Sequence, residues 1–140
     1  MFSLRFFGRF REFGLFLLRA GLGFMFIIHG SSKIFAGPET WSQVGGAMAN
    51  WGITMWPTFW GFMAAFAEFG GGIFFILGFL FRPAAILLTI TMAVAATMHI
   101  QMDGLMTLKG FSSYSHAVEL GIVFFSLIFI GPGKLSIDGD

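Results

Sequence analysis

Four long apolar blocks alternate with shorter polar segments along this chain. They lie at approximately residues 13–29, 57–81, 83–102 and 114–131. Each is close to the ~20 residues that an α-helix needs to cross a bilayer core of ~30 Å. The pattern therefore predicts an all-α fold, an integral membrane four-helix bundle in which residues 1–140 form a single transmembrane domain.

The ends of two blocks carry further signals. Arg19 interrupts the first block and no small-residue cleavage site follows it, so we expect a retained span rather than a signal peptide. Arg82 and Pro83 separate the second and third blocks. Since proline is tolerated in the first turn of a helix, this junction predicts a tight hairpin.

Basic residues are distributed unequally between the two sides of the predicted bundle. Cytoplasmic loops of membrane proteins are enriched in lysine and arginine. With the N-terminus inside, one side holds five such residues and the other side holds two. The five are Arg5, Arg9, Arg11, Arg82 and Lys134, and the two are Lys33 and Lys109. This bias predicts that the N and C termini are both cytoplasmic.

The long loop, residues 31–56, lies on the outer side in this topology. It contains Trp41, Trp51 and Trp56, and Trp60 follows just beyond it. Tryptophan is enriched where membrane helices meet water, so an aromatic belt is the first interpretation. The second is a lid or platform over a site on the outer face.

Composition agrees with a membrane protein and excludes several functions. The chain is 56% hydrophobic and only 11% charged, with a mean hydropathy of +0.84. A net charge of +1 without a basic run gives no indication of nucleic-acid binding. Because the chain has no cysteine, it has no disulfide, thiolate nucleophile or cysteine-ligated metal. Redox chemistry would therefore need a bound cofactor or a partner subunit.

Two opposite charges fall inside the predicted spans. Counting ~1.5 Å of rise per residue puts Arg19 and Glu68 within a few ångströms of each other in depth. Ionisable residues at such depth normally face the bundle interior and pair. The two side chains are thus predicted to form an ion pair, with a structural or a functional role.

Polar residues gather near the outer ends of the predicted helices. His29 ends the first span, His99 lies near the end of the third, and His116 near the start of the fourth, with Glu119 on the same helix face. Lys33 follows the first span. These side chains predict a polar ring at the outer mouth of an apolar bundle.

The ring has three interpretations that the sequence leaves open. Histidine tolerates the headgroup region, so the ring could have no function. His29, His99 and His116 could instead hold a metal ion, although His116 and Glu119 form only a single i,i+3 pair. Third, the side chains could donate hydrogen bonds to a quinone-like ring while Glu68 or Glu119 carries protons. The ligand-binding candidates are Arg19, His29, Lys33, Glu68, His116 and Glu119.

Glycine and proline residues give further signals about the backbone. Gly70, Gly71 and Gly72 follow Glu68 and give the backbone room beside a buried carboxylate. Gly131 and Pro132 end the fourth span. Asp138 is expected to be solvated and to have no catalytic role.

Three stretches in this order resemble the DoxX family of small four-helix membrane proteins. They are "RAGLGFMFIIHGSSKIF" from Arg19, "AEFGGGIFFILGFLFRPAA" across the second hairpin, and "GPGKLSID" at the close. The positions that match the family pattern are Arg19, His29, Gly30, Lys33, Glu68, Gly78, Arg82 and the terminal Gly-Pro-Gly.

The resemblance implies a multi-pass protein of the bacterial inner membrane. Some relatives are the membrane subunit of a thiosulfate:quinone oxidoreductase, and others are linked to oxidoreductase complexes in oxidative-stress defence. It thus implies a membrane subunit of a redox-associated complex with quinone as the ligand. Its expected partners are the lipid bilayer, a redox partner subunit and further copies of the chain in a homo-oligomer. The alternative is a non-enzymatic scaffold or small-molecule transporter whose buried charges are structural.

Overall fold

The computed structural model describes residues 4–139, which form helices and turns without a β-strand. Five α-helices and two short 3₁₀-helices follow one another along this part of the chain. They are η1 (Arg5–Phe10), α1 (Arg11–Ile34), α2 (Pro38–Gly45), η2 (Gly46–Trp51), α3 (Pro57–Leu77), α4 (Phe81–Asp103) and α5 (Leu108–Ile130).

Four of these helices have the length and hydropathy of membrane spans. They are α1 with its η1 extension, α3, α4 and α5. The predicted all-α, four-helix membrane fold is therefore confirmed.

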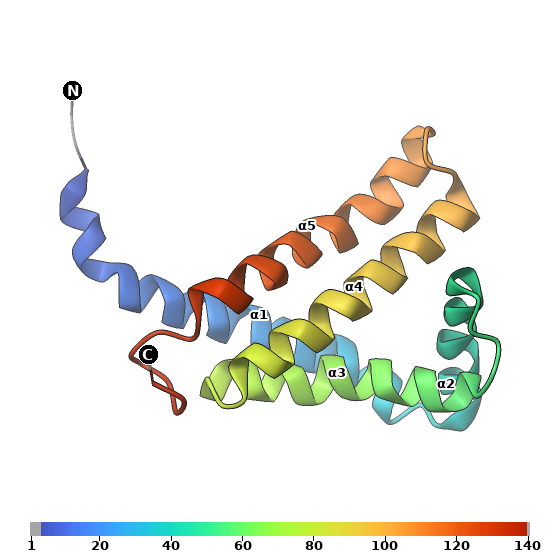
Figure 1. Cartoon of the computed structure of the whole chain (residues 1–140), viewed down its shortest axis with the longest axis horizontal. Coiled ribbons are helices and arrows are strands. Elements are labelled where there is room, and N and C mark those ends of the chain that lie inside the picture. The colour runs from blue at the N-terminus through green and yellow to red at the C-terminus, as the bar shows by residue number, and fades with distance from the viewer. Residues whose placement is uncertain (1–3, 140) are drawn as a thin grey trace.

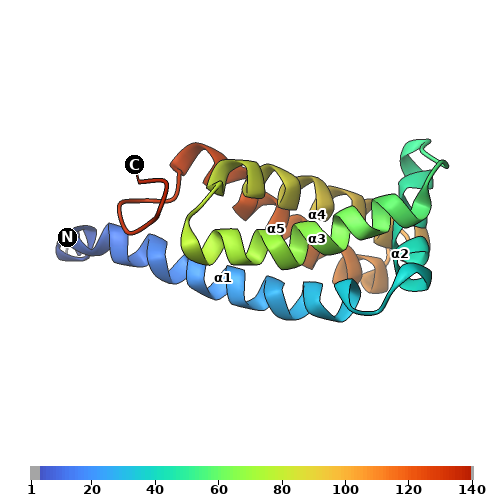
Figure 2. The ribbon, with the colours of Figure 1, turned by 90° about the horizontal axis from the view of Figure 1, so that it is seen from below.

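The bundle is built from two helix pairs (Figure 1, Figure 2). The backbone of α1 packs closely along α3, and that of α4 packs along α5, whereas α3 and α4 share a smaller contact. Both chain ends lie at one end of the bundle and α2 lies at the other. We call these the termini end and the α2 end. In Figure 1 the two pairs cross and diverge toward the α2 end.

The observed boundaries of the helices differ from those of the predicted apolar blocks. Helix α1 continues five residues past His29, to Ile34. Helix α3 stops at Leu77 because Gly78 adopts a left-handed φ of 61°, where the Phe79 N–H bonds the Phe74 carbonyl. Helix α5 begins six residues earlier than Tyr114, since the Thr107 hydroxyl accepts a hydrogen bond from the Gly110 N–H and caps it.

Glycines fix the register between α1 and α3. A Cβ atom on Gly30 would lie 2.3 Å from the backbone nitrogen of Phe69, and one on Gly23 would lie 2.5 Å from the Gly72 carbonyl oxygen. Such contacts are closer than atoms can approach, so only glycine permits this spacing. Close backbone approach at small residues is a common basis of helix association in membranes.

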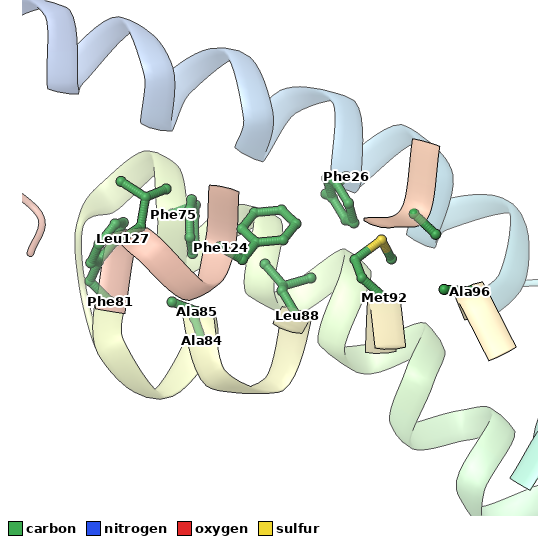
Figure 3. Close-up of a cluster of buried hydrophobic side chains, with 11 residues drawn as sticks. Phe26, Phe75, Phe81, Ala84, Ala85, Leu88, Met92, Ala96, Phe124 and Leu127 are labelled. Atoms are coloured by element: carbon green, nitrogen blue, oxygen red, sulfur yellow. The ribbon is translucent and has the colours of Figure 1, made fainter. Parts of the chain in front are cut away.

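A cluster of buried side chains joins the two pairs (Figure 3). Phe124 of α5 packs edge-on against Phe26 of α1 and Phe75 of α3, with ring centroids 5.0 and 5.3 Å apart. Phe81 of α4 lies 4.5 Å from Phe75. Large aromatic rings therefore fill the bundle near its termini end, while Met92, Ala96 and Ala117 continue the cluster toward the α2 end.

Arg19 is fully buried at the termini end and bonds only to backbone carbonyls. Its guanidinium donates to the carbonyls of Phe75 and Ile76 at 3.2 and 3.1 Å, near the end of α3, and to that of Leu135 in the C-terminal segment. One charged group thus ties together α1, α3 and the residues after α5. Its Nε has no partner among the described residues.

The C-terminal segment folds back across this end of the bundle. The Asp138 carboxylate accepts the N–H groups of Leu80 and Phe81 at 3.1 and 2.9 Å, so it caps α4 from a distant part of the sequence. This cap supports Leu80, which has a φ of 47° that is rare for a side chain of its kind. Asp138 is exposed, as expected, and it also has a structural role. At the other side, Glu12 accepts the Lys134 N–H at 2.7 Å.

Gly30→Ala should separate α1 from α3, because the added methyl group meets backbone rather than a flexible side chain. Overpacking of this kind costs roughly 1–3 kcal/mol or more. The measurement is thermal unfolding in detergent, with Gly21→Ala on the same helix as the control. Gly21 has open space around it, so its substitution should be neutral or stabilising by up to about 1 kcal/mol. Equal stability of the two variants would contradict the close approach.

Arg19→Lys should destabilise the termini end although it keeps the charge. An ammonium group cannot match the planar fork that reaches three carbonyls. Losing charge-assisted hydrogen bonds there should cost on the order of 3 kcal/mol of unfolding free energy. Arg11→Lys is the control, because Arg11 is exposed and bonds only its neighbour Glu12, so the change should stay within about 0.5 kcal/mol. A tolerated Arg19→Lys would show that the carbonyl contacts contribute little.

Candidate functional site

Two cavities lie between the helix pairs toward the α2 end. The smaller has a volume of about 230 Å³ and is lined by α1, α3, α4 and α5. The larger, of about 380 Å³, is lined by α1, α2, η2, α3 and α4. Both are bordered by Lys33, Glu68, Ala95 and His99, so these four residues mark where the cavities adjoin.

Small side chains create the space. Ala95 and Ala117 line the smaller cavity, and Ala64, Ala67 and Ala95 line the larger one. Larger side chains, among them Phe26 in the smaller cavity and Trp60 in the larger, form other parts of the walls. The divergence of the two helix pairs leaves a volume that alanine cannot fill, and this positions both cavities.

Lys33 and Glu68 form an ion pair at the junction of the cavities. The Lys33 Nζ lies 2.7 Å from both carboxylate oxygens of Glu68. The Glu68 side chain is only 5% exposed, whereas that of Lys33 is 34% exposed. Glu68 lies mid-way along α3, and Lys33 reaches it from the last turn of α1.

The predicted ion pair between Arg19 and Glu68 is wrong. The contact of Gly30 with Phe69 sets the register of α1 on α3, and this register puts Lys33, one turn beyond Gly30, beside Glu68. Arg19 lies instead at the level of Phe75 and Ile76, two turns further along α3. Counting depth on each helix separately cannot give this relative shift.

The structure brings all three histidines to the smaller cavity. His29 comes from α1, His99 from α4 and His116 from α5, and Lys33 and Glu68 line the same space. His99 is half-buried, whereas His29 and His116 are exposed at the rim. Among residues 4–139 no hydrogen bond or ion pair of these imidazoles is found. His99 lies near the Asp103 carboxylate, which is paired with the Lys109 ammonium at 2.7 Å.

The metal interpretation finds no geometric support. Within the described chain, no three His, Cys, Asp or Glu side chains come close enough together to hold a metal ion. His29, His99 and His116 line one cavity without forming a ligand set. The arrangement instead offers separated hydrogen-bond donors and acceptors around an apolar volume.

Two further candidates lie away from the cavities. Arg19 lines neither of them, and its contacts are the carbonyls at the termini end. Glu119 also lines neither cavity and is exposed on α5, although it lies one turn from His116. Of the six ligand-binding candidates, four therefore meet at the cavities: His29, Lys33, Glu68 and His116.

The segment of residues 31–56 covers the larger cavity rather than forming an open loop. Val44, Gly45, Ala47 and Met48 line it from α2 and η2. The Trp51 indole N–H donates to the Thr97 hydroxyl of α4 at 2.9 Å, which ties η2 across the cavity. The segment thus lies over the cavity, as the second interpretation expects, while Trp51 and Trp56 are exposed, as the aromatic-belt interpretation expects.

Trp41 and Trp60 hold the platform to the helices around it. The Trp41 indole donates to the Lys33 carbonyl at 2.9 Å, at the end of α1. Trp60 lines the larger cavity, and its indole donates to the Met55 carbonyl at 3.0 Å. The backbone carbonyl of Lys33 is thus fixed by the same segment that encloses its side chain.

Sequence reasoning missed Ser113 and Met92 of the smaller cavity, whereas Trp60 of the larger cavity was named with the tryptophan-rich segment. Ser113, His116, Ala117 and Leu120 follow the 3–4 residue spacing of one helix face, which was a usable signal once α5 was extended to Leu108. Met92 carries no such signal, because only the tertiary packing decides which apolar side chains line a cavity.

Comparisons with known proteins agree with this architecture. The DoxX family model matches residues 14–100, which is more than half of the chain and includes Arg19, His29, Lys33, Glu68 and His99. An uncharacterized protein of Haemophilus influenzae is 28% identical over 131 residues, covering 93% of this chain and 92% of that protein. No solved structure matches the chain significantly.

The spans and the family match point to the same class of protein. Four helices have the length and hydropathy to cross a bilayer, and the matched region runs from the start of α1 nearly to the end of α4. The chain is a multi-pass membrane protein that belongs to the DoxX family.

Proposed function

We propose that this protein is the membrane subunit of a redox-associated complex and binds a quinone between its helix pairs. The observation that carries the proposal is the convergence of Lys33, Glu68 and three histidines on one cavity in an otherwise apolar bundle. A purely structural ion pair would not need three imidazoles around it. Polar groups placed around an apolar volume are typical of small-molecule sites.

The two cavities suit the two parts of a quinone. In the smaller cavity, imidazole N–H groups or the Lys33 ammonium would donate to the carbonyl oxygens of the ring. The larger cavity is lined mainly by apolar side chains such as Leu87, Ile90 and Val94, and would take the hydrocarbon tail. Its volume of about 380 Å³ falls in the range of about 300–1,000 Å³ usual for ligand pockets.

The residues of this site would also handle protons. A bound quinone supplies two-electron, two-proton redox chemistry. Glu68 and Lys33 are in direct contact, and His99 lines both cavities, so a proton can be held at the Glu68 carboxylate or an imidazole nitrogen close to the ring. The chain has no cysteine for thiol redox chemistry, so electrons would come from a further bound cofactor or, as the family resemblance suggests, from a redox partner subunit.

Orientation and location are part of the proposal. The positive-inside bias supports cytoplasmic N and C termini, and the family supports the bacterial inner membrane. The histidines and the platform of α2 and η2 would then lie in the half of the bundle away from the cytoplasm.

Protein purified mildly from its native membrane should carry close to one quinone per chain, measured by extraction and mass spectrometry. His99→Ala combined with His116→Ala should lower that ratio at least fivefold, because both imidazoles line the cavity. Gln101→Ala is the control, since Gln101 is exposed near the end of α4 and lines neither cavity. Phospholipid alone in the wild-type extract would overturn the proposal.

A double-mutant cycle separates this function from the scaffold or transporter alternative. Lys33→Met should destabilise by about 3 kcal/mol, because it leaves the Glu68 carboxylate buried and unpaired. Lys33→Met with Glu68→Leu should recover much of that loss, since no charge is left without a partner. Thermal unfolding measures both effects.

The quinone content of the recovered double variant decides whether the Lys33–Glu68 ion pair contacts the ligand or only stabilises the bundle. If the ion pair contacts the ligand, a stable double variant should lose its quinone. A stable double variant that keeps the wild-type quinone content would show that Lys33 and Glu68 serve assembly alone.

A further inference from the structure

The midpoint of α5 carries a charged side chain on the outside of the bundle. Glu119 is the twelfth of the 23 residues of α5, so it lies about 16 Å from either end of the helix at the usual helical rise. It is exposed, and it makes no hydrogen bond or ion pair with residues 4–139. Glu119 lies five residues inside the apolar stretch that begins at Tyr114, so in a membrane this exposed side chain faces lipid ~8 Å inside the span.

An uncovered carboxyl group at this depth is costly. Ionisable residues inside membranes almost always face protein, a water-filled cavity or a partner group. Among residues 4–139 no cation pairs with Glu119: Arg19 bonds carbonyls at the termini end, Lys33 is paired with Glu68, and Lys109 is paired with Asp103. Glu119 therefore needs a partner from outside this chain.

Glu119 belongs to a continuous polar stripe along α5, made of Ser112, Ser115, Glu119 and Ser126. The spacing of three, four and seven residues keeps these side chains on one face, as in the seam of a helix pair. The Ser112 and Ser126 hydroxyls donate to the carbonyls of Leu108 and Ile122 in their own helix, at 3.0 and 2.8 Å. Their oxygens remain available as acceptors, and their small size permits close approach of another helix.

We propose that this stripe is the contact surface for a second copy of the chain. Two copies insert in the same orientation, so a two-fold axis along the membrane normal brings each stripe against the other at equal depth. The axis places the two Glu119 side chains at the same depth, so each carboxyl group turns toward the N-terminus of its helix, as helical side chains do, and accepts from the Ser115 hydroxyl and the His116 imidazole of the second copy. These donors lie one turn before Glu119 on the same helix, and His116 is exposed next to the stripe.

The dimer would also complete the wall of the smaller cavity. His116 lines this cavity and is exposed at its rim on the side of α5 that adjoins the stripe. A second α5 placed on the stripe covers that rim with protein instead of lipid. The contact requires no quinone, so the proposed dimer can be tested separately from the proposed quinone binding.

Single-cysteine cross-linking tests the contact directly, because the natural chain has no cysteine. Ser115→Cys and Ser126→Cys, oxidised in native membranes, should give a product near twice the chain mass of 15.4 kDa. Val118→Cys and Phe125→Cys are matched controls, since both side chains are exposed (40% and 55%) but point about 100° around the helix from Glu119 and Ser126. Their yield should be at least tenfold lower.

Substitution of Glu119 in the Ser126→Cys background, which keeps the Ser115 hydroxyl, tests the role of the carboxyl group. Glu119→Gln keeps a hydrogen-bonding side chain and should keep the cross-link, whereas Glu119→Leu should lower its yield about threefold to tenfold. Equal yields at stripe and control positions, or no product at the stripe, would overturn the proposal. So would a product of a mass other than twice the chain, which would identify a different partner on this face, or a Glu119→Leu variant that cross-links like the parent.

Discussion

A charge placed in the hydrocarbon of a membrane must find its partners within protein, and this constraint organises the bundle. At the termini end, the Arg19 guanidinium donates hydrogen bonds to backbone carbonyls of α3 and of the C-terminal segment. Near the cavities, Lys33 and Glu68 form an ion pair. The contacts of Arg19 join three chain segments, whereas the Lys33–Glu68 ion pair lies at the border of the two cavities.

The two ends of the bundle differ in how their side chains pack. Near the termini, the rings of Phe75, Phe81 and Phe124 fill the space between the helix pairs, so this end has a closed core. Toward α2, alanines form part of the walls and the helix pairs diverge, which opens two adjoining cavities. The rigid end holds the helices in place while the open end offers a site.

The platform of α2 and η2 connects local structure to that site. Pro38 and Pro57 start α2 and α3, and the Trp51 and Trp41 indoles bond to α4 and to the end of α1. The larger cavity is therefore enclosed by a segment held at both edges by indole hydrogen bonds. A ligand with an apolar tail would have to pass this segment or enter between the diverging helix pairs.

The sequence by itself determined the helical membrane fold, because four runs of about 20 apolar residues have few alternatives to spanning helices. It also identified His29, Lys33, Glu68 and His116 as polar residues in unusual places, since hydropathy makes any ionisable group in such runs conspicuous. It could not pair them correctly. The partner of Glu68 depends on the register of α1 on α3, which close contacts at Gly23 and Gly30 decide. The cap that Asp138 provides to α4 and the meeting of the histidines depend on how distant segments fold together. Only the tertiary structure decided these features, because hydropathy reports the depth of a residue but not the direction in which its side chain points.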